Sequence, residues 1–153
     1  MKPPRQAIRL TEAAVLDRLP RLLEAVSEVC DAAGADPATR HDLRLAVEEA
    51  CVNVMRHAYR DSGPGDLTLD VARIEWQGAP AMRVIVQDHG LAFDPLAQAP
   101  PIPAASGEPL RIGGLGVHLM KQVTDAQDYH RDATTGNNLT LVKLLKPRLG
   151  EEE

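Results

Sequence analysis

A glutamate, an asparagine and a histidine recur at intervals of four residues in one mainly apolar segment: Glu49, Asn53 and His57. In a helix, this spacing stacks the three side chains along one side. That side lies next to the apolar stripe, so the three groups should lie at the rim of the core. A carboxylate and an amide oxygen there could share a hard cation with a phosphate, or orient a nucleophile. A solvated helix face with an incidental Glu–His pair has the same spacing, so both interpretations stay open.

An aspartate stands at the end of the apolar run 84–86, and a glycine follows two residues later: Asp88 and Gly90. A carboxylate where a strand leaves the sheet can accept a hydrogen bond from a buried amine, such as the exocyclic amino group of adenine. The glycine lets the backbone turn closely past a ligand. The alternative is a plain turn that ends a strand.

Three glycines, Gly113, Gly114 and Gly116, lead into the apolar segment 115–125. If a helix begins there, its free N–H groups and its positive dipole end favour an anion such as phosphate. The pattern is neither a Walker A loop, because GxxxxGK[ST] is absent, nor a Rossmann fingerprint, because no parallel βαβ unit precedes it. A flexible hinge before a helix is the alternative.

Hydrophobic periodicity and turn residues predict the elements that would position these groups. Strands are expected over 5–10, 67–76, 81–88, 126–131 and 138–146, and helices over 12–33, from 37 to about 59, and over 115–125. The irregular stretch 89–114 is long enough to be functional or disordered. This order predicts an α/β two-layer sandwich, in which a mixed, mainly antiparallel sheet has helices on one face.

Capping residues suggest where the first two helices begin and end. Thr11 is the expected N-cap of the first helix and Gly34 its stop. Pro20 either kinks that helix or lies in its first turn, in which case the regular part begins near residue 17. Asp36 and Pro37 have the order of an N-cap and a first helical residue.

Composition excludes several classes of protein. The chain has 153 residues, a net charge of −5, one Trp, two Tyr and one Phe, so it offers neither a basic surface nor aromatic platforms for nucleic acid. No apolar run is long enough to cross a membrane, and residues 1–10 do not resemble a secretory signal. Cys30 and Cys51 lie in apolar helical patterns, as buried thiols do in a reducing compartment. We therefore expect one cytoplasmic domain over residues 1–153.

Read in order, Glu-x-x-x-Asn on a helix, Asp-x-Gly after a strand and Gly-x-Gly opening a helix resemble the N, G1 and G2 boxes of the GHKL ATPase/kinase superfamily. Residues 45–59, 88–95 and 113–120 are similar to the stand-alone anti-sigma-factor serine/threonine kinases. The resemblance covers nearly the whole chain and implies the Bergerat ATP-binding fold. It also implies that ATP and Mg²⁺ bind between the helices and the sheet.

The resemblance implies a role for individual residues. Asn53 would be the Mg²⁺ ligand, Asp88 would read adenine, and Glu49 would be the base that orients the attacking hydroxyl. Residues 96–113 would form a lid over the nucleotide, and we expect 97–110 to be the least ordered part without a ligand. The remaining expected nucleotide contacts are Gly90, Arg111, Gly114, Leu115, Gly116, Val117 and Thr140.

Two functions follow from the resemblance. One is a kinase that phosphorylates a serine or threonine of an anti-sigma-factor antagonist and also sequesters a sigma factor. The other is an ATP-responsive switch that holds a partner protein without transferring phosphate. The chain has Ile112 where that branch often has arginine, although Arg111 stands one residue earlier. A homodimer is expected, and neither nucleic acid nor a membrane is expected as a partner.

Overall fold

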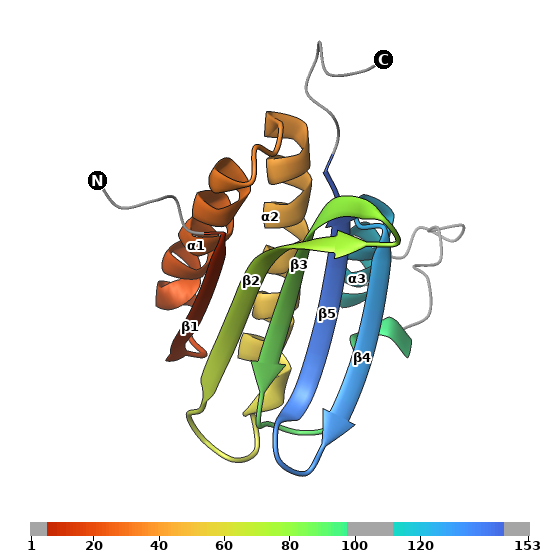
Figure 1. Cartoon of the computed structure of the whole chain (residues 1–153). Coiled ribbons are helices and arrows are strands. Elements are labelled where there is room, and N and C mark those ends of the chain that lie inside the picture. Colours follow the sequence, from red (N-terminus) through yellow and green to blue (C-terminus); the bar gives the residue numbers. More distant parts are fainter. Residues whose placement is uncertain (1–5, 98–111, 146–153) are drawn as a thin grey trace, which may run out of the picture.

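Five strands form one antiparallel sheet in the computed structural model, which describes residues 6–97 and 112–145 (Figure 1). The sheet order is β1-β2-β3-β5-β4, and every pairing is antiparallel. The strands are β1 (Ala7–Ala13), β2 (Asp66–Trp76), β3 (Ala79–Asp88), β4 (Ala126–Asp132) and β5 (Gly136–Leu144). The predicted sheet is confirmed, and no parallel pair occurs among the described strands.

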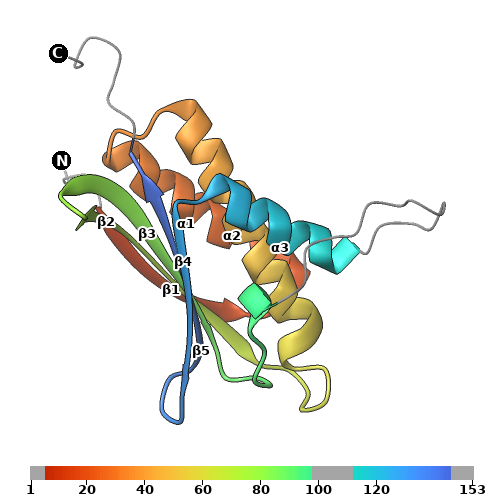
Figure 2. The same cartoon turned by 90° about the vertical axis from the view of Figure 1, so that its right-hand side faces the viewer.

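Three helices cover one face of this sheet (Figure 2). They are α1 (Leu19–Ala32), α2 (Pro37–Asn53) and α3 (Ile112–Val123). Burial alternates along β2, where Leu67, Leu69 and Val71 are fully buried and the residues between them are partly exposed. The core therefore lies between the helices and one face of the sheet, as the predicted two-layer sandwich requires.

The start of the first helix differs from the prediction. Thr11 is a strand residue of β1, and its hydroxyl shares a 2.8 Å hydrogen bond with that of Thr68 on β2. Pairing of β1 with β2 continues to Ala13, so a short 3₁₀ turn, η1 (Leu16–Arg18), comes before α1. Pro20 then lies in the first turn of α1, which was the second of the two alternatives. Thr11 is therefore not an N-cap.

The predicted stop of α1 and start of α2 are confirmed. Gly34 has a positive φ of 77°, in the left-handed region that ends helices. The Asp36 side chain accepts a 2.7 Å hydrogen bond from the Thr39 backbone N–H, and Pro37 is the first residue of α2. Both features belong to helix ends, where the first N–H and last C=O groups have no partner within the helix. The residues that meet this need are close in sequence, so local sequence was sufficient to locate both ends.

Three other boundaries differ from expectation. The helix predicted to reach residue 59 is α-helical to Asn53 and then becomes a π-helical turn, η2 (Val54–Ala58). The β2–β3 turn consists only of Gln77 and Gly78, both with positive φ, so β3 begins at Ala79. α3 begins at Ile112, which places the three glycines inside its first turns.

A second 3₁₀ turn, η3 (Pro95–Ala97), follows β3. Most of the predicted lid, including Arg111, lies outside the described residues, as does the expectation of low order over 97–110. Among the helices described, none is both long and apolar enough to cross a bilayer.

The one-sided core predicts a strong contrast between neighbouring residues of β2. Leu69→Ala should lower the free energy of unfolding by about 2–5 kcal/mol, because Leu69 is fully buried under the helices. Thr68→Ala, on the other face, should cost less than about 1.5 kcal/mol, since it removes one hydroxyl hydrogen bond. Urea unfolding measures both, and equal losses would contradict the one-sided core.

Candidate functional site

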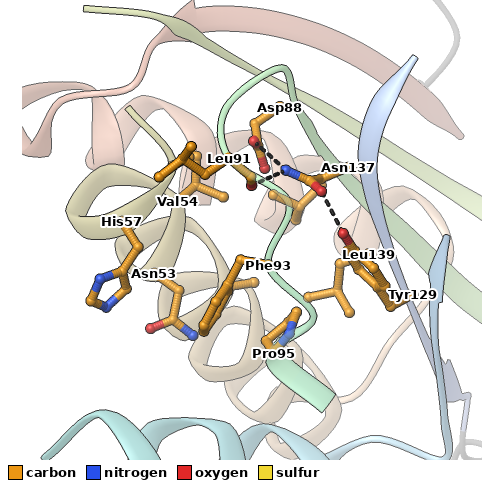
Figure 3. Close-up of a pocket in the computed structure, with 13 residues that line it drawn as sticks. Asn53, Val54, His57, Asp88, Leu91, Phe93, Pro95, Tyr129, Asn137 and Leu139 are labelled. Atoms are coloured by element: carbon orange, nitrogen blue, oxygen red, sulfur yellow. Dashed lines mark hydrogen bonds between the residues drawn. The ribbon is translucent and has the colours of Figure 1, made fainter. Parts of the chain in front are cut away.

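A pocket opens where α2 and η2 meet the ends of β3 and β5 (Figure 3). The space between its walls, open solvent at the mouth included, is about 400 Å³. Its walls are mainly apolar, with a few polar groups. The lining residues are Ala50, Asn53, Val54, His57, Ala58, Val86, Asp88, Leu91, Phe93, Pro95, Tyr129, Asn137 and Leu139.

Asp88 is the buried acid of this pocket, with 5% of its surface exposed. Its Oδ1 accepts hydrogen bonds from the backbone N–H of Gly90 and from Nδ2 of Asn137, each 2.9 Å long. Both described bonds go to the same oxygen, so Oδ2 is the oxygen left to accept from a ligand. This oxygen can accept a hydrogen bond from an amino group; that the group belongs to adenine stays a prediction.

Asn137 is a buried polar residue of the pocket wall that was not predicted from the sequence. It is 4% exposed, lines the pocket, and lies opposite Asp88 in the β3–β5 register. In the sequence it follows Thr134, Thr135 and Gly136, and asparagine after such residues is typical of a turn. Only the strand register shows that it faces Asp88, and that register is a long-range property.

Thr140 does not reach this pocket. Asn137 and Leu139 of β5 line it, and side chains alternate between the two faces of a strand. Thr140 is one residue beyond Leu139, so it points to the sheet face opposite the helices. The expected contact between Thr140 and adenine therefore disagrees with the structure; Asn137 is the polar residue of β5 at this site.

Asn53 lies at the other end of the pocket, in the last turn of α2. Its Nδ2 is buried and has no hydrogen-bond partner among the described residues. Such a group is costly unless something satisfies it. Beside it, the ring of His57 packs on that of Phe93, with centroids 5.7 Å apart and planes tilted by 34°. The structure thus brings Asn53 and Asp88 to one pocket.

Glu49 lies one turn before Asn53 and is not part of the pocket wall. Its carboxylate lies against α3. The approach is so close that a Cβ on Gly116 would overlap Oε2 of Glu49. Burial raises the pKa of Glu49 above its ordinary value of 4.5; the charge of Glu48 adds to this rise and Arg56 opposes it. Glu49 is therefore a carboxyl group at the α2–α3 contact, with its proton affinity increased.

The glycines have structural neighbours that the sequence did not reveal. A Cβ on Gly90 would overlap the backbone of Ala58, and the next residue, Leu91, donates a 2.8 Å hydrogen bond to the Ala58 carbonyl. Gly90 thus lets the segment after β3 dock on η2. Gly116 likewise makes room for Glu49. Nucleotide contacts by the backbone of either glycine stay predictions.

The remaining predicted contacts lie on α3. Gly114 and Leu115 belong to its first turn, and Val117 is buried in the hydrophobic core, so only its backbone could meet a ligand. Two contacts place α3 in the fold: Gly116 lies against Glu49 of α2, and Lys121, in a later turn, donates a 2.8 Å hydrogen bond to the Leu96 carbonyl of η3. Among the described residues, no group of three or more His, Cys, Asp or Glu side chains could hold a metal ion.

Comparison with known proteins agrees with this geometry. The sequence profile of the histidine kinase-like ATPase domain matches residues 13–143. The chain is 35% identical over 88 residues to the serine-protein kinase RsbW of Bacillus velezensis, an alignment that spans 55% of this chain and 52% of that protein. It is 29% identical over 132 residues to the RsbW of Listeria monocytogenes serotype 4a, spanning 84% and 80%.

The chain thus spans about half the length of the Bacillus relative that it matches. In a crystal structure of the RsbU and RsbW domains of Rv1364c from Mycobacterium tuberculosis, a region covering 94% of this chain and 34% of that one superposes with a TM-score of 0.65. At 18% sequence identity, this likeness supports the fold alone.

The raised pKa of Glu49 predicts a pH-dependent effect of Glu49→Gln. The folded state binds this proton more tightly than the unfolded chain does. Glu49 therefore contributes most to stability below pH 4.5, and that contribution is lost as the pH rises through the folded pKa. Glu49→Gln should raise the free energy of unfolding at pH 7, and the gain should shrink below pH 4.5.

Urea unfolding at several pH values measures this difference. Glu24→Gln, at an exposed position of α1, is the control and should change stability little at any pH. A Glu49→Gln protein that is less stable than the wild type at pH 7 would contradict the burial of this carboxylate.

Proposed function

The chain belongs to the histidine kinase-like ATPase domain family, and on that premise we propose that its pocket binds ATP with Mg²⁺. The proposal depends on the buried carboxylate of Asp88. Its Oδ1 accepts two hydrogen bonds from the protein, which leaves Oδ2 for a ligand. A buried acceptor of this kind needs a donor, and the amino group of adenine supplies one. The apolar walls suit the faces of a flat base.

Asn53 is the proposed Mg²⁺ ligand. Magnesium prefers oxygen ligands and in nucleotide sites is held by few protein groups together with the phosphates. The donor set fits, because Asn53 offers an amide oxygen, the kind of ligand that Mg²⁺ prefers, in the pocket wall. The bound ion would neutralise charge on the phosphates.

The phosphates are proposed to extend toward the first turn of α3. This turn has free backbone N–H groups and the positive end of a 12-residue helix, both of which favour an anion. Gly114, Leu115 and Gly116 occupy it or follow it directly. Arg111, which precedes the helix, is the proposed cation for the phosphates; it lies outside the described residues.

Two substitutions test the binding proposal. Asp88→Asn should weaken ATP binding by about 10- to 100-fold, because it replaces a charged hydrogen-bond acceptor. Asn53→Ala should remove most of the Mg²⁺ dependence of binding and leave contacts to the base in place. Isothermal titration with ATP, with and without Mg²⁺, measures both effects.

Asp128→Asn is the matched control, since this aspartate is exposed on β4, away from the pocket wall. It should bind ATP as the wild type does. Wild-type affinity for ATP in Asp88→Asn would contradict the proposed base contact, and an unchanged Mg²⁺ dependence in Asn53→Ala would contradict the ligand assignment.

We propose further that the chain is a protein serine/threonine kinase acting on an anti-sigma-factor antagonist, and that it also binds a sigma factor. The names of the serine-protein kinase relatives support the kinase activity. The proposed partners follow from the resemblance of residues 45–59, 88–95 and 113–120 to the anti-sigma-factor kinases. Glu49 is the proposed base. Its carboxylate would take the hydroxyl proton as that oxygen bonds to the γ-phosphorus and the bond to the bridging oxygen breaks, releasing ADP. Burial, which raises the pKa of Glu49, increases the affinity of its carboxylate for that proton.

A cytoplasmic homodimer is part of the same proposal. The thiols of Cys30 and Cys51 are free and buried, as is common in reducing compartments.

The second candidate function is a switch that binds ATP and a partner protein without transferring phosphate. It is favoured by Ile112, which stands where the anti-sigma kinases often have arginine.

Glu49→Gln separates the kinase from the switch. It should lower phosphate transfer to an antagonist protein by about 100-fold or more, as loss of a general base does, and leave ATP affinity within about twofold. Gly116→Ala should also slow transfer, because the new Cβ displaces the Glu49 carboxylate. The flexible end of that side chain can move, so the fold should persist.

Transfer of the labelled γ-phosphate of ATP to a candidate antagonist measures the rates, and thermal unfolding checks the fold. Glu48→Gln, the same change one residue earlier, is the control and should retain transfer. Full activity in Glu49→Gln would show that another group is the base, and no transfer by the wild type to any antagonist would favour the switch.

A further inference from the structure

The side chain of Asn137 is fixed in one orientation by two donors on β4. Its Oδ1 accepts a hydrogen bond from the Tyr129 hydroxyl and another, 2.9 Å long, from Nη1 of Arg131. A guanidinium group can only donate, so the amide atom that faces it must be the oxygen. Flipping the amide would bring N–H against N–H. The β4 side chains therefore determine which way the amide points.

This orientation directs Nδ2 of Asn137 toward the segment that ends β3. Nδ2 donates to Oδ1 of Asp88 over 2.9 Å and to the carbonyl oxygen of Leu91 over 2.8 Å (Figure 3). Arg131 also donates to the Gly90 carbonyl over 3.2 Å. Asp88 and the segment after it are thus held from β4 through Asn137. We call Asn137, Tyr129 and Arg131 the β4–β5 clamp.

The clamp restricts Asp88 in a way that matters for base choice. An amino purine carries its donor on the exocyclic nitrogen at position 6, whereas a keto purine carries an acceptor there and moves its donor to the ring nitrogen N1. A mobile aspartate could shift to follow the donor. An aspartate with Oδ1 held by two N–H groups in a buried, weakly screened site cannot shift without breaking them.

We propose that the β4–β5 clamp is the positioning device that makes this pocket select 6-amino purine nucleotides over 6-keto purine nucleotides. The inference rests on the proposed ATP site and deepens it. Asn137 contacts Asp88 and fixes its carboxylate, while Tyr129 and Arg131 act through Asn137. Discrimination arises because a fixed acceptor meets the keto oxygen, another acceptor, and like groups in contact disfavour the wrong ligand.

The experiment compares the dissociation constants of ATP and inosine triphosphate, which differ only at position 6 and N1, by titration calorimetry in the presence of Mg²⁺. The wild type should prefer ATP by about 10-fold or more, the usual value of a hydrogen bond to a charged group. Asn137→Leu, which has a similar shape but no hydrogen bonds, should bring the two constants to within about threefold.

Tyr129→Phe is the milder variant and removes only one hydroxyl group from the clamp. It should give an intermediate preference, and it keeps the proposal testable if Asn137→Leu does not fold. Tyr59→Phe is the matched control. The Tyr59 hydroxyl donates to the carbonyl of Asp66 and accepts a 2.9 Å bond from His89 N–H, so its loss loosens the same segment without touching Asn137.

Tyr59→Phe should lower the thermal unfolding temperature and leave the preference for ATP unchanged. A wild-type preference in folded Asn137→Leu, or in Tyr129→Phe, would overturn the clamp. An equal loss of preference in Tyr59→Phe would reduce the clamp to general structural support and overturn its specific role. A wild type that binds ATP and inosine triphosphate equally would overturn the clamp alone, whereas one that binds neither would overturn the proposed function itself.

Discussion

The buried carboxylate of Asp88 is the constraint on which the site depends. A carboxylate with 5% exposure is stable in the fold only if hydrogen bonds replace the water that it loses. Two N–H donors do so at Oδ1, one from the turn after β3 and one from Asn137 on β5. Because both donors are needed, the turn after β3 must bring the Gly90 N–H to Asp88, and the β3–β5 register must place Asn137 opposite it. It also leaves one oxygen for a ligand.

Close approach of the backbone gives this site its rigid frame. Gly90 allows the segment after β3 to dock against Ala58, and Gly116 allows α3 to approach Glu49. A side chain at Gly90 would meet the backbone of Ala58 and separate the two segments, whereas one at Gly116 would displace only the side chain of Glu49. The π-helical turn η2 begins directly after Asn53. Such turns occur frequently at functional sites. The proposed base and metal ligand are thus fixed on α2, between the sheet and α3.

Local sequence predicted the groups whose spacing lies within one element. Glu49 and Asn53 share a helix face, and Asp88 with Gly90 ends a strand, so periodicity and turn chemistry were sufficient. Asn137 was hidden among turn residues because only the β3–β5 register places it against Asp88. The resemblance assigned Thr140 to the site, but Thr140 lies on the opposite face of the sheet. The register of a strand decides which face each residue takes, and local sequence does not encode it.

A crystal structure of the protein with Mg²⁺ and a non-hydrolysable ATP analogue tests most directly whether Asp88 reads an adenine base in this pocket. We expect the exocyclic amino nitrogen about 3 Å from Oδ2 of Asp88, with Oδ1 still held by Asn137 and the metal on Asn53. A base bound outside this pocket, or one whose amino group contacts another acceptor, would contradict it.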